Sequence, residues 1–137
     1  MKLNKAAGVG ITHKDNVLLA KRIKFHQGKP VAFGGYWSIF SGAVELNEKP
    51  NECAARELWE EAQIKVDPID LNFIHTIKRK NVDLDVFFIE SKELIFPTLN
   101  DEHTEYGWFV IEDLKSFPYK LDKEIRLSIK KWHKMCK

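Results

Sequence analysis

The sequence is poor in the features that mark several classes of protein. Only two of its 137 residues are cysteines, Cys53 and Cys136, which argues against a disulfide framework or a cysteine-based zinc site. No apolar run approaches the length of a transmembrane helix, and residues 1–12 lack the uninterrupted apolar stretch of a signal peptide. We therefore expect a protein of the reducing cytoplasm with no membrane segment.

An excess of charge of one sign is also missing. The 22 basic and 20 acidic residues leave a net charge of +2, which is too even to indicate a nucleic-acid-binding protein. Two short basic runs, at 21–24 and 78–80, are most simply interpreted as solvated surface. Repeats and low-complexity segments are absent as well. We therefore expect one domain, spanning 1–137, that is long enough to bury one core.

The chain does contain a succession of β-prone segments separated by turn-forming residues. The segments expected as strands are 7–12, 16–22, 36–40, 69–79, 83–91 and 106–111. The first two flank a turn-rich tetrapeptide, which predicts a hairpin. The glycine-rich stretch 24–35 and the acidic stretch 99–105 are expected to be loops.

Two further segments have the patterns of α-helices. Pro50 suits the first turn of a helix that runs to about Gln63, because its missing N–H costs nothing there. Residues 121–135 gather their apolar side chains on one side, which is typical of a surface helix that faces a core. Strands and helices interleave without a strict βαβ rhythm. The sequence therefore predicts an α/β (α+β) fold in which helices sandwich a mixed β-sheet.

The first of these helices carries an unusual concentration of carboxylates. Glu57, Glu60 and Glu61 fall on one arc at spacings of three and four residues, where like charges repel by a few tenths of a kcal/mol per pair. A solvated face is the ordinary interpretation, but only Arg56 is nearby to compensate, and Trp59 adds no solubility. Hard divalent cations prefer several carboxylate oxygens. The cluster therefore favours a magnesium or manganese site that faces phosphates.

The wider spacing around this helix resembles the Nudix box. The stretch Gly42–Ile64 matches that family's pattern G-x5-E-x7-R-E-U-x-E-E-x-G-U, where U is a bulky aliphatic residue, at every fixed position but one. Gln63 replaces a glycine that ends the helix in a left-handed conformation, which costs another residue about 1 kcal/mol. Asn47, which also replaces a common glycine, tolerates that conformation better. The order of strands resembles the family's α/β/α sandwich over the whole chain.

The resemblance implies a pyrophosphohydrolase that cleaves the P–O–P bridge of a nucleoside diphosphate linked to another group. It implies Arg56, Glu57, Glu60 and Glu61 as the catalytic residues. The three glutamates would hold Mg²⁺, for which Mn²⁺ can substitute, and the backbone carbonyl of Ser41 would be a further ligand. Cations held in this way would stabilise the charge that develops on phosphate oxygens.

Other residues of the box are expected to support these ligands. Arg56 is expected to pair with Glu48 or Glu57 and to fix the geometry on that side of the helix. Glu45 and Glu48 are expected to contribute a ligand or to orient water. Gly42 opens the box and completes this set of candidates.

The general base has more than one candidate. Glu57 is the first. Glu102 and Glu105 precede Trp108, in the region that supplies an extra carboxylate in many members of the family. An exposed acidic loop is the ordinary interpretation of both residues. His103, which lies between them, is expected to be solvated.

Candidates for substrate binding come from the segments before the box. Phe33 and Tyr36 could stack on a base, whereas Trp37 is better explained as part of the core. Arg22 ends the second predicted strand and could reach a phosphate or a carbonyl, as could residues 78–79. The stretch 24–35 is expected to carry the discrimination between substrates, because specificity lies on loops held by a rigid scaffold.

Three functions follow in order of preference. The first is hydrolysis of a small nucleotide, such as a nucleoside triphosphate or a nucleotide sugar, with no stable nucleic-acid partner. The second is an RNA 5′-end pyrophosphohydrolase, which is favoured only if 21–24 and 78–80 converge beside the site. The third is a non-catalytic nucleotide-binding module, although such modules typically lose the glutamates that this chain keeps. Both a monomer and a homodimer are compatible with the sequence.

Overall fold

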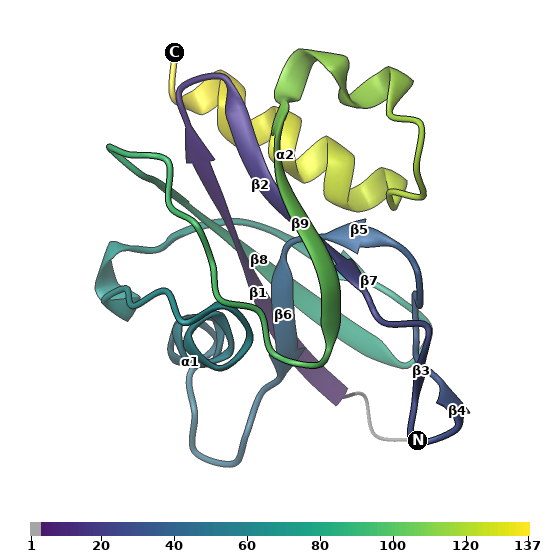
Figure 1. Cartoon of the computed structure of the whole chain (residues 1–137). Coiled ribbons are helices and arrows are strands. Elements are labelled where there is room, and N and C mark those ends of the chain that lie inside the picture. Colours follow the sequence, from purple (N-terminus) through teal and green to yellow (C-terminus); the bar gives the residue numbers. More distant parts are fainter. Residues whose placement is uncertain (1–3) are drawn as a thin grey trace.

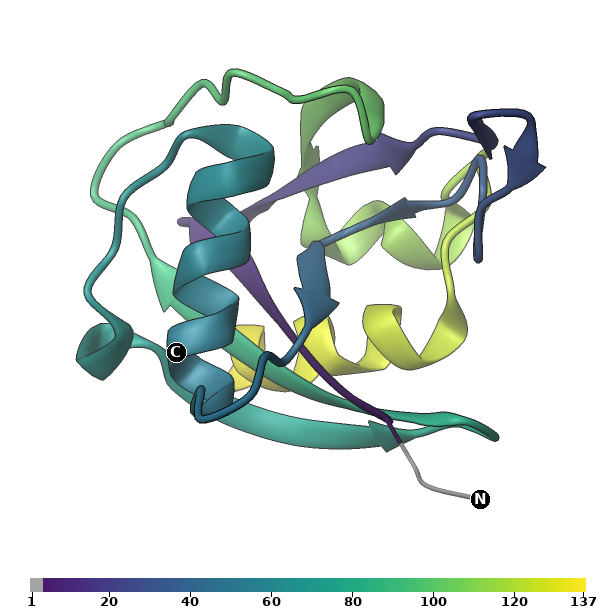
Figure 2. The same cartoon turned by 90° about the horizontal axis from the view of Figure 1, so that it is seen from below.

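The computed structural model describes residues 4–137 and places a mixed β-sheet between two layers of helix (Figures 1 and 2). The strands are β1 (Asn4–His13), β2 (Asn16–Arg22), β3 (Phe25–His26), β4 (Lys29–Pro30), β5 (Trp37–Ser38), β6 (Phe40–Ala43), β7 (Asn72–Lys78), β8 (Val82–Glu90) and β9 (His103–Val110). The helices are α1 (Pro50–Ala62), α2 (Lys123–Met135) and two 3-10 helices, η1 (Pro68–Asp70) and η2 (Ile111–Ser116). The predicted α/β/α sandwich with a mixed sheet is confirmed.

The central strand β1 has different neighbours along its two edges. It runs parallel to β8 on one edge, as shown by the register Ala7↔Asp85. On the other edge its first half pairs with β6, through Ala7↔Gly42, and its second half pairs with β2, through Ile11↔Leu18. Because β6 and β2 share one edge of β1 in succession, the sheet divides there, and the region of the site lies beside that division.

The sheet buries both of its faces. Along β2, Leu18 and Ala20 belong to the core beneath α1, whereas Val17 and Leu19 belong to the core beneath α2. This alternation follows from the two-residue period of a strand. The strand reads as a nearly continuous apolar run because helices cover both sides.

The helix α1 begins and ends where the sequence predicts. Pro50 is its first residue, and the Glu52 carboxylate accepts a hydrogen bond from the Lys49 N–H at 2.8 Å. Gln63 ends it with φ 54° and ψ 37°, in the left-handed region, and its N–H donates to the Trp59 carbonyl at 2.9 Å. The helix exit therefore keeps the path expected of a glycine, and the strained conformation is present.

Several boundaries differ from the prediction. The β-prone segment 36–40 is divided between β5 and β6, which pair with different strands. The stretch 24–35 contains the small hairpin β3–β4, which forms a sheet of its own. The acidic loop ends at Glu102, because β9 already begins at His103. For 36–40 and for β9, pairing between distant segments decided what the local composition left open, whereas the β3–β4 hairpin is a local pairing.

The second helix and the chain termini complete the comparison. α2 begins at Lys123, and Asp122 caps it by accepting the Ile125 N–H at 3.2 Å. Within residues 4–137 no helix is both long and apolar enough to cross a membrane. The expectation for residues 1–12 falls partly on residues 1–3, which lie outside the described residues.

Candidate active site

The carboxylates of α1 approach the backbone of β6 at Gly42. A Cβ atom built on this glycine would overlap the carboxylate of Glu57. Glu57 is 9% exposed, and Glu61, one helical turn further along, is 2% exposed. Close approach therefore requires glycine at position 42, and the result is two buried carboxylates at the edge of β6.

Burial changes the protonation of this pair. One oxygen of Glu61 accepts a hydrogen bond from the Ser41 N–H at 3.1 Å. Burial, reinforced by the carboxylates of Glu57 and Glu102, raises the pKa of Glu61 to about 9. Burial also raises the pKa of Glu57. The metal-free pair therefore retains a proton at neutral pH, which a bound divalent cation would replace.

The third glutamate of the predicted cluster lies apart from these two. The Glu60 side chain is 48% exposed and pairs with Arg56 at 3.1 Å between Nη1 and Oε2. The structure thus brings Glu57 and Glu61 together against β6 and leaves Glu60 on the solvent side of α1. A helical wheel assigns all three glutamates to one arc. Their difference in burial arises from the packing of β6 against the helix, which a helical wheel does not describe.

Arg56 is the cation of this cluster. Its guanidinium donates two hydrogen bonds to Glu48, at 2.7 and 3.0 Å, one to Glu57 at 2.8 Å and one to the Ala43 carbonyl at 3.0 Å. Glu45 lies 3.5 Å away. The pairing expected with Glu48 or Glu57 is therefore formed with both. The hydrogen bonds from Arg56 lower the pKa of Glu48 to about 2, and Glu48 in turn raises the pKa of Arg56.

The donor set fits a hard divalent cation. Carboxylate oxygens are the ligands that Mg²⁺ and Mn²⁺ prefer, and the raised pKa values of the two buried carboxylates show that Arg56 beside Glu57 does not fully offset their burial. Across residues 4–137, no three side chains of His, Cys, Asp or Glu are already grouped as a complete metal site. A bound ion would therefore need more oxygens, such as the Ser41 carbonyl, the Glu60 carboxylate and water.

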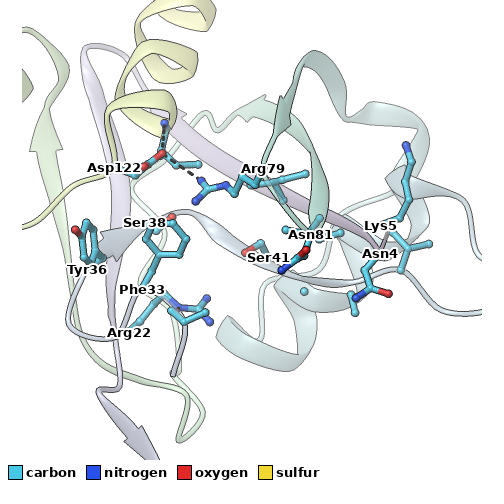
Figure 3. A pocket seen from close by; sticks show the side chains of 18 of the residues that line it. Asn4, Lys5, Arg22, Phe33, Tyr36, Ser38, Ser41, Arg79, Asn81 and Asp122 are labelled. Carbon is cyan, nitrogen blue, oxygen red and sulfur yellow. Dashed lines mark hydrogen bonds and ion pairs between the residues drawn. The ribbon is translucent and has the colours of Figure 1, made fainter. Parts of the chain in front are cut away.

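A cavity of about 610 Å³ opens beside β6 (Figure 3). Its wall includes Ser41 and Gly42, the end of β2, residues of the segment 32–36, the turn between β7 and β8 and the start of α2. The backbone that contacts the carboxylate pair therefore also faces the cavity. The volume lies within the range of small-molecule sites, roughly 300–1,000 Å³.

The three residues predicted to bind substrate all line this cavity. The rings of Phe33 and Tyr36 meet edge to face with centroids 5.3 Å apart. Arg22 also lines it and donates from Nε to the Ala32 carbonyl at 3.1 Å. Trp37 is 5% exposed, which agrees with its assignment to the core.

Arg79, Asn81 and Asp122 also lie in the cavity wall. Of these three, the sequence pointed only to Arg79, as a candidate for reaching a phosphate or a carbonyl. The sequence treats Lys78 and Arg79 alike, but the Lys78 side chain is 80% exposed and pairs with Asp83. Since neighbours on a strand face opposite sides, strand period could have separated these two. No sequence signal pointed to Asn81 or Asp122.

The two acidic candidates for a general base, Glu102 and Glu105, have different surroundings. Glu102 lies near enough to contribute to the raised pKa of Glu61, and it accepts a hydrogen bond from the Asn100 side chain at 3.1 Å. Glu105 belongs to β9, where it pairs with Lys21 at 3.6 Å with its side chain 58% exposed. Of the two, only Glu102 has an electrostatic effect on the carboxylate pair.

The expectation that His103 is solvated is wrong. The residue is 5% exposed, and its ring meets that of Phe40 with centroids 5.2 Å apart. Neither ring nitrogen has a hydrogen-bond partner within residues 4–137. Burial, followed by the charge of Arg22, lowers the pKa of His103 to about 4, so the imidazole is neutral at neutral pH. The prediction failed because His103 begins a strand that pairs with β2.

Fold and site together define a class of protein. A mixed sheet between two helical layers presents two buried carboxylates of one helix beside a cavity of nucleotide size. The model of the NUDIX domain family matches residues 2–132. The chain belongs to this family, as its resemblance to the Nudix box predicts.

Proteins of known sequence agree with this assignment. The chain is 34% identical over 91 residues to an 8-oxo-dGTP diphosphatase of Proteus vulgaris, which covers 64% of this chain and 76% of that protein. It is 43% identical over 42 residues to an octanoyltransferase of Myxococcus xanthus, but this stretch covers 31% of the chain and only 12% of that protein. So short a match carries no argument about acyl transfer.

Solved structures show the same fold. A MutT NUDIX hydrolase of Burkholderia pseudomallei is 20% identical and superposes with a TM-score of 0.78, covering 96% of this chain and 98% of that one. A NUDIX-family hydrolase of Clostridium perfringens is 22% identical with a TM-score of 0.76, covering all of both chains. The predicted membership of a family of pyrophosphohydrolases is therefore confirmed, and the substrate is a separate question.

Proposed function

We propose that the protein is a divalent-metal-dependent pyrophosphohydrolase of small nucleotides, of the nucleoside triphosphate or nucleotide sugar class. The observation that carries this proposal is the buried pair Glu57 and Glu61, held against the wall of a 610 Å³ cavity. Buried carboxylates without sufficient positive charge are costly unless they serve a ligand. A divalent cation held by these carboxylates would supply that charge and would attract substrate phosphates.

The proposed site assigns different tasks to the residues of the box. Glu57, Glu61 and the Ser41 carbonyl would hold Mg²⁺ or Mn²⁺, and Glu60 would join them on leaving Arg56. When bound, the ion would stabilise negative charge on the phosphate oxygens. Arg56 keeps Glu57 in place through their 2.8 Å contact. Either Glu57 or a residue outside the helix would accept the proton of the attacking water.

Among residues outside the helix, Glu102 suits the role of general base better than Glu105. Its carboxylate acts on the pKa of Glu61, whereas Glu105 is engaged with Lys21. Exchange of Glu102 for Gln should lower kcat if it takes the proton. The equivalent change at Glu105 should have little effect and serves as its matched control.

The cavity would hold the nucleoside part of the substrate. Phe33 and Tyr36 offer aromatic surface, and among residues 4–137 the Arg22 guanidinium donates one hydrogen bond, from Nε to the Ala32 carbonyl. The name of the Proteus relative makes an oxidised purine nucleoside triphosphate one of the first substrates to test.

A substrate panel with a metal control tests this function. Nucleoside triphosphates, their 8-oxo purine forms, nucleotide sugars and dinucleoside polyphosphates are incubated with Mg²⁺, and the products are separated by chromatography. We expect release of pyrophosphate or phosphate with a nucleotide product, and none in excess chelator. Equal turnover in chelator, or no turnover of any class, would contradict the proposal.

A second candidate, the RNA 5′-end pyrophosphohydrolase, is favoured by one observation. The basic runs 21–24 and 78–80 both contribute to the cavity, through Arg22 and Arg79. Binding of RNA should weaken steeply with salt, because each phosphate contact releases counterions. A kcat/KM for a 5′-triphosphorylated oligonucleotide that exceeds the value for the mononucleotide at low salt, and falls more steeply with salt, would favour this candidate.

The remaining expectations accompany this proposal. We propose that 1–137 acts as one domain, in a reducing compartment, either alone or as a homodimer. Cys53 and Cys136 are both free thiols, and burial raises the pKa of Cys53 to about 12. The preserved glutamates favour an enzyme over a non-catalytic nucleotide-binding module.

A further inference from the structure

Arg79 joins three parts of the chain that are distant in sequence. It follows β7, where its N–H donates to the Val82 carbonyl at 3.0 Å in the turn to β8. Its guanidinium covers the ring of Phe33 in the segment 24–36, with Cζ 4.3 Å from the ring centroid. It also donates from Nη2 to Asp122 Oδ2 at 3.2 Å. Figure 3 shows this ion pair in the wall of the cavity.

Two backbone hydrogen bonds of 2.9 Å join Gly35 and Tyr36 to Arg22, and side-chain contacts hold the rest of the segment 24–36. Its hairpin β3–β4 pairs only within itself. Arg22 holds the Ala32 carbonyl at 3.1 Å, and Arg79 holds the ring of Phe33. Phe33 has a φ of 57°, a left-handed conformation that is unfavourable for phenylalanine. The attraction between guanidinium and ring therefore stabilises a backbone that would not be adopted by local preference.

Asp122 anchors the opposite end of the contact. The oxygen that binds Arg79 also caps α2 by accepting the Ile125 N–H at 3.2 Å. The side chains of the pair are 21% and 23% exposed, so water screens their attraction only in part. The guanidinium is thus fixed to the first turn of a helix that belongs to the core.

These contacts form a closed circuit of side chains around one side of the cavity. Phe33 meets Tyr36 edge to face, and the Lys120 ammonium lies 5.7 Å from the Tyr36 ring centroid. Lys120 precedes Asp122 by two residues, and Asp122 in turn accepts the hydrogen bond from Arg79. The guanidinium links the turn after β7 to these side chains.

We propose that Arg79 is a positioning residue that sets the substrate selectivity of the cavity. It fixes the distance between Phe33 and Asp122, so that the planar part of a substrate meets a wall of constant shape. The phosphate end, beside Gly42, lies on a different part of the wall. The inference rests on the proposed function in one respect, namely that a nucleotide occupies this cavity.

A role in positioning differs from direct binding of phosphate. Lysine at this position would keep the positive charge but lose the planar guanidinium that stacks on Phe33 and donates to Asp122. If Arg79 positions these residues, Arg79→Lys and Arg79→Gln should have similar effects. If Arg79 binds phosphate by its charge, Arg79→Lys should retain most of the wild-type affinity.

Kinetics on purine and pyrimidine nucleoside triphosphates provide the first test. For Arg79→Lys we expect KM for the best nucleotide to rise about tenfold, with kcat within about twofold of wild type, because one well-ordered contact is lost. The ratio of kcat/KM between the best and the poorest nucleotide should shrink by a similar factor. The inhibition constant of inorganic tripolyphosphate, which has no base, should stay unchanged. Lys78→Gln, a neighbouring change outside the cavity, is the control and should match wild type.

A second test follows the segment itself. Trypsin should cut after Lys24, which precedes Phe25, faster in Arg79→Lys than in the wild type or Lys78→Gln, at equal melting temperature. Phe33→Leu should reproduce the loss of selectivity, and the double variant with Arg79→Lys should add little, because both changes break one contact.

The outcomes separate this inference from the proposed function. If the wild type hydrolyses no nucleotide, the proposed function fails, and binding of non-hydrolysable nucleotides together with proteolysis still decides the role of Arg79. Wild-type selectivity and wild-type proteolysis in Arg79→Lys would overturn the positioning role. So would a loss of affinity for tripolyphosphate in Arg79→Gln that Arg79→Lys restores, which would assign Arg79 to phosphate binding.

Discussion

The two ends of the candidate site are built in different ways. At the α1 end, beside the cavity wall, Glu57 lies against the backbone at Gly42 and Glu61 accepts the Ser41 N–H. At the other end, Phe33 and Arg79 come from separate segments and meet through side chains alone. The first arrangement has the spacing of a helical turn, whereas the second depends on contacts across the fold.

Under the proposed function, this difference corresponds to a division of tasks. Groups that hold an ion must keep their geometry, and a helix packed on a strand provides it. Groups that distinguish substrates can vary with the loops that carry them. We therefore expect changes at the α1 end to abolish turnover and changes at the Arg79 end to alter selectivity.

The largest effect should come from neutralising the buried pair. Glu57→Gln and Glu61→Gln each remove a charge at constant size, so kcat with Mg²⁺ should fall by orders of magnitude, since charge stabilisation is usually the largest catalytic contribution. Glu60→Gln should have a smaller effect, because its side chain is exposed and already neutralised by Arg56. Steady-state kinetics with the best nucleotide measure all three.

Glu52→Gln is the matched control for these variants. Glu52 lies on the same helix but is exposed, and its amide equivalent can still accept the Lys49 N–H. Turnover and metal dependence should stay near wild type. Full activity in both Glu57→Gln and Glu61→Gln would contradict the metal-site interpretation and favour the interpretation of the cluster as a solvated helix face.

At the α1 end, Glu61 should make the stability of the metal-free protein depend on pH. The pKa of Glu61 rises from 4.5 to about 9 on folding, so between these values the folded state holds a proton that the unfolded chain has lost. This group therefore makes the free energy of unfolding fall as pH rises from about 5 to about 9. Melting curves in chelator should show this slope in the wild type and a flatter one in Glu61→Gln. An equal slope in both would contradict the raised pKa.

His103, between β2 and the Phe40 ring, should act in the opposite pH direction. Its pKa falls from 6.5 to about 4 on folding, so stability is fully present above pH 6.5 and is lost as pH falls through about 4. His103→Leu removes this acid loss and two unpaired buried nitrogens, whose burial costs on the order of 1 kcal/mol or more. The variant should melt higher than wild type at pH 5, by a larger margin than at pH 7.

The smallest effect concerns the end of α1 that presents Glu61. Gln63 has φ 54°, so Gln63→Gly should stabilise the fold by about 1 kcal/mol. Asn47→Gly, at φ 64°, should gain less, because asparagine tolerates this conformation. Denaturant unfolding measures both, and a destabilised Gln63→Gly variant would show that contacts of the Gln63 side chain outweigh the backbone strain.

Much of the fold could be predicted because its signals are local. Pro50 marks the start of α1, and the segment up to Gln63 carries its own apolar arc. The hairpin of β1 and β2 follows from two apolar runs around a turn. Prediction failed for residues 36–40 and at His103, where the partner strand, far away in sequence, decides which residues pair.

The candidate site was predictable to the same extent. The Nudix spacing identified Gly42, Glu57 and Glu61, because their contacts lie within one loop and one helix. It does not include Arg79 or Asp122, which are 43 residues apart and meet because α2 packs against β7.

By itself, the sequence determined the family, the helix that carries the carboxylates and the conformational demand at Gln63, because these depend on spacing within a few turns of chain. Only the tertiary structure decided that Glu57 and Glu61 are buried while Glu60 is exposed, and that His103 is neutral within the core. Burial, pKa and contacts between distant segments depend on what packs against a residue, and a residue's neighbours along the chain do not specify this.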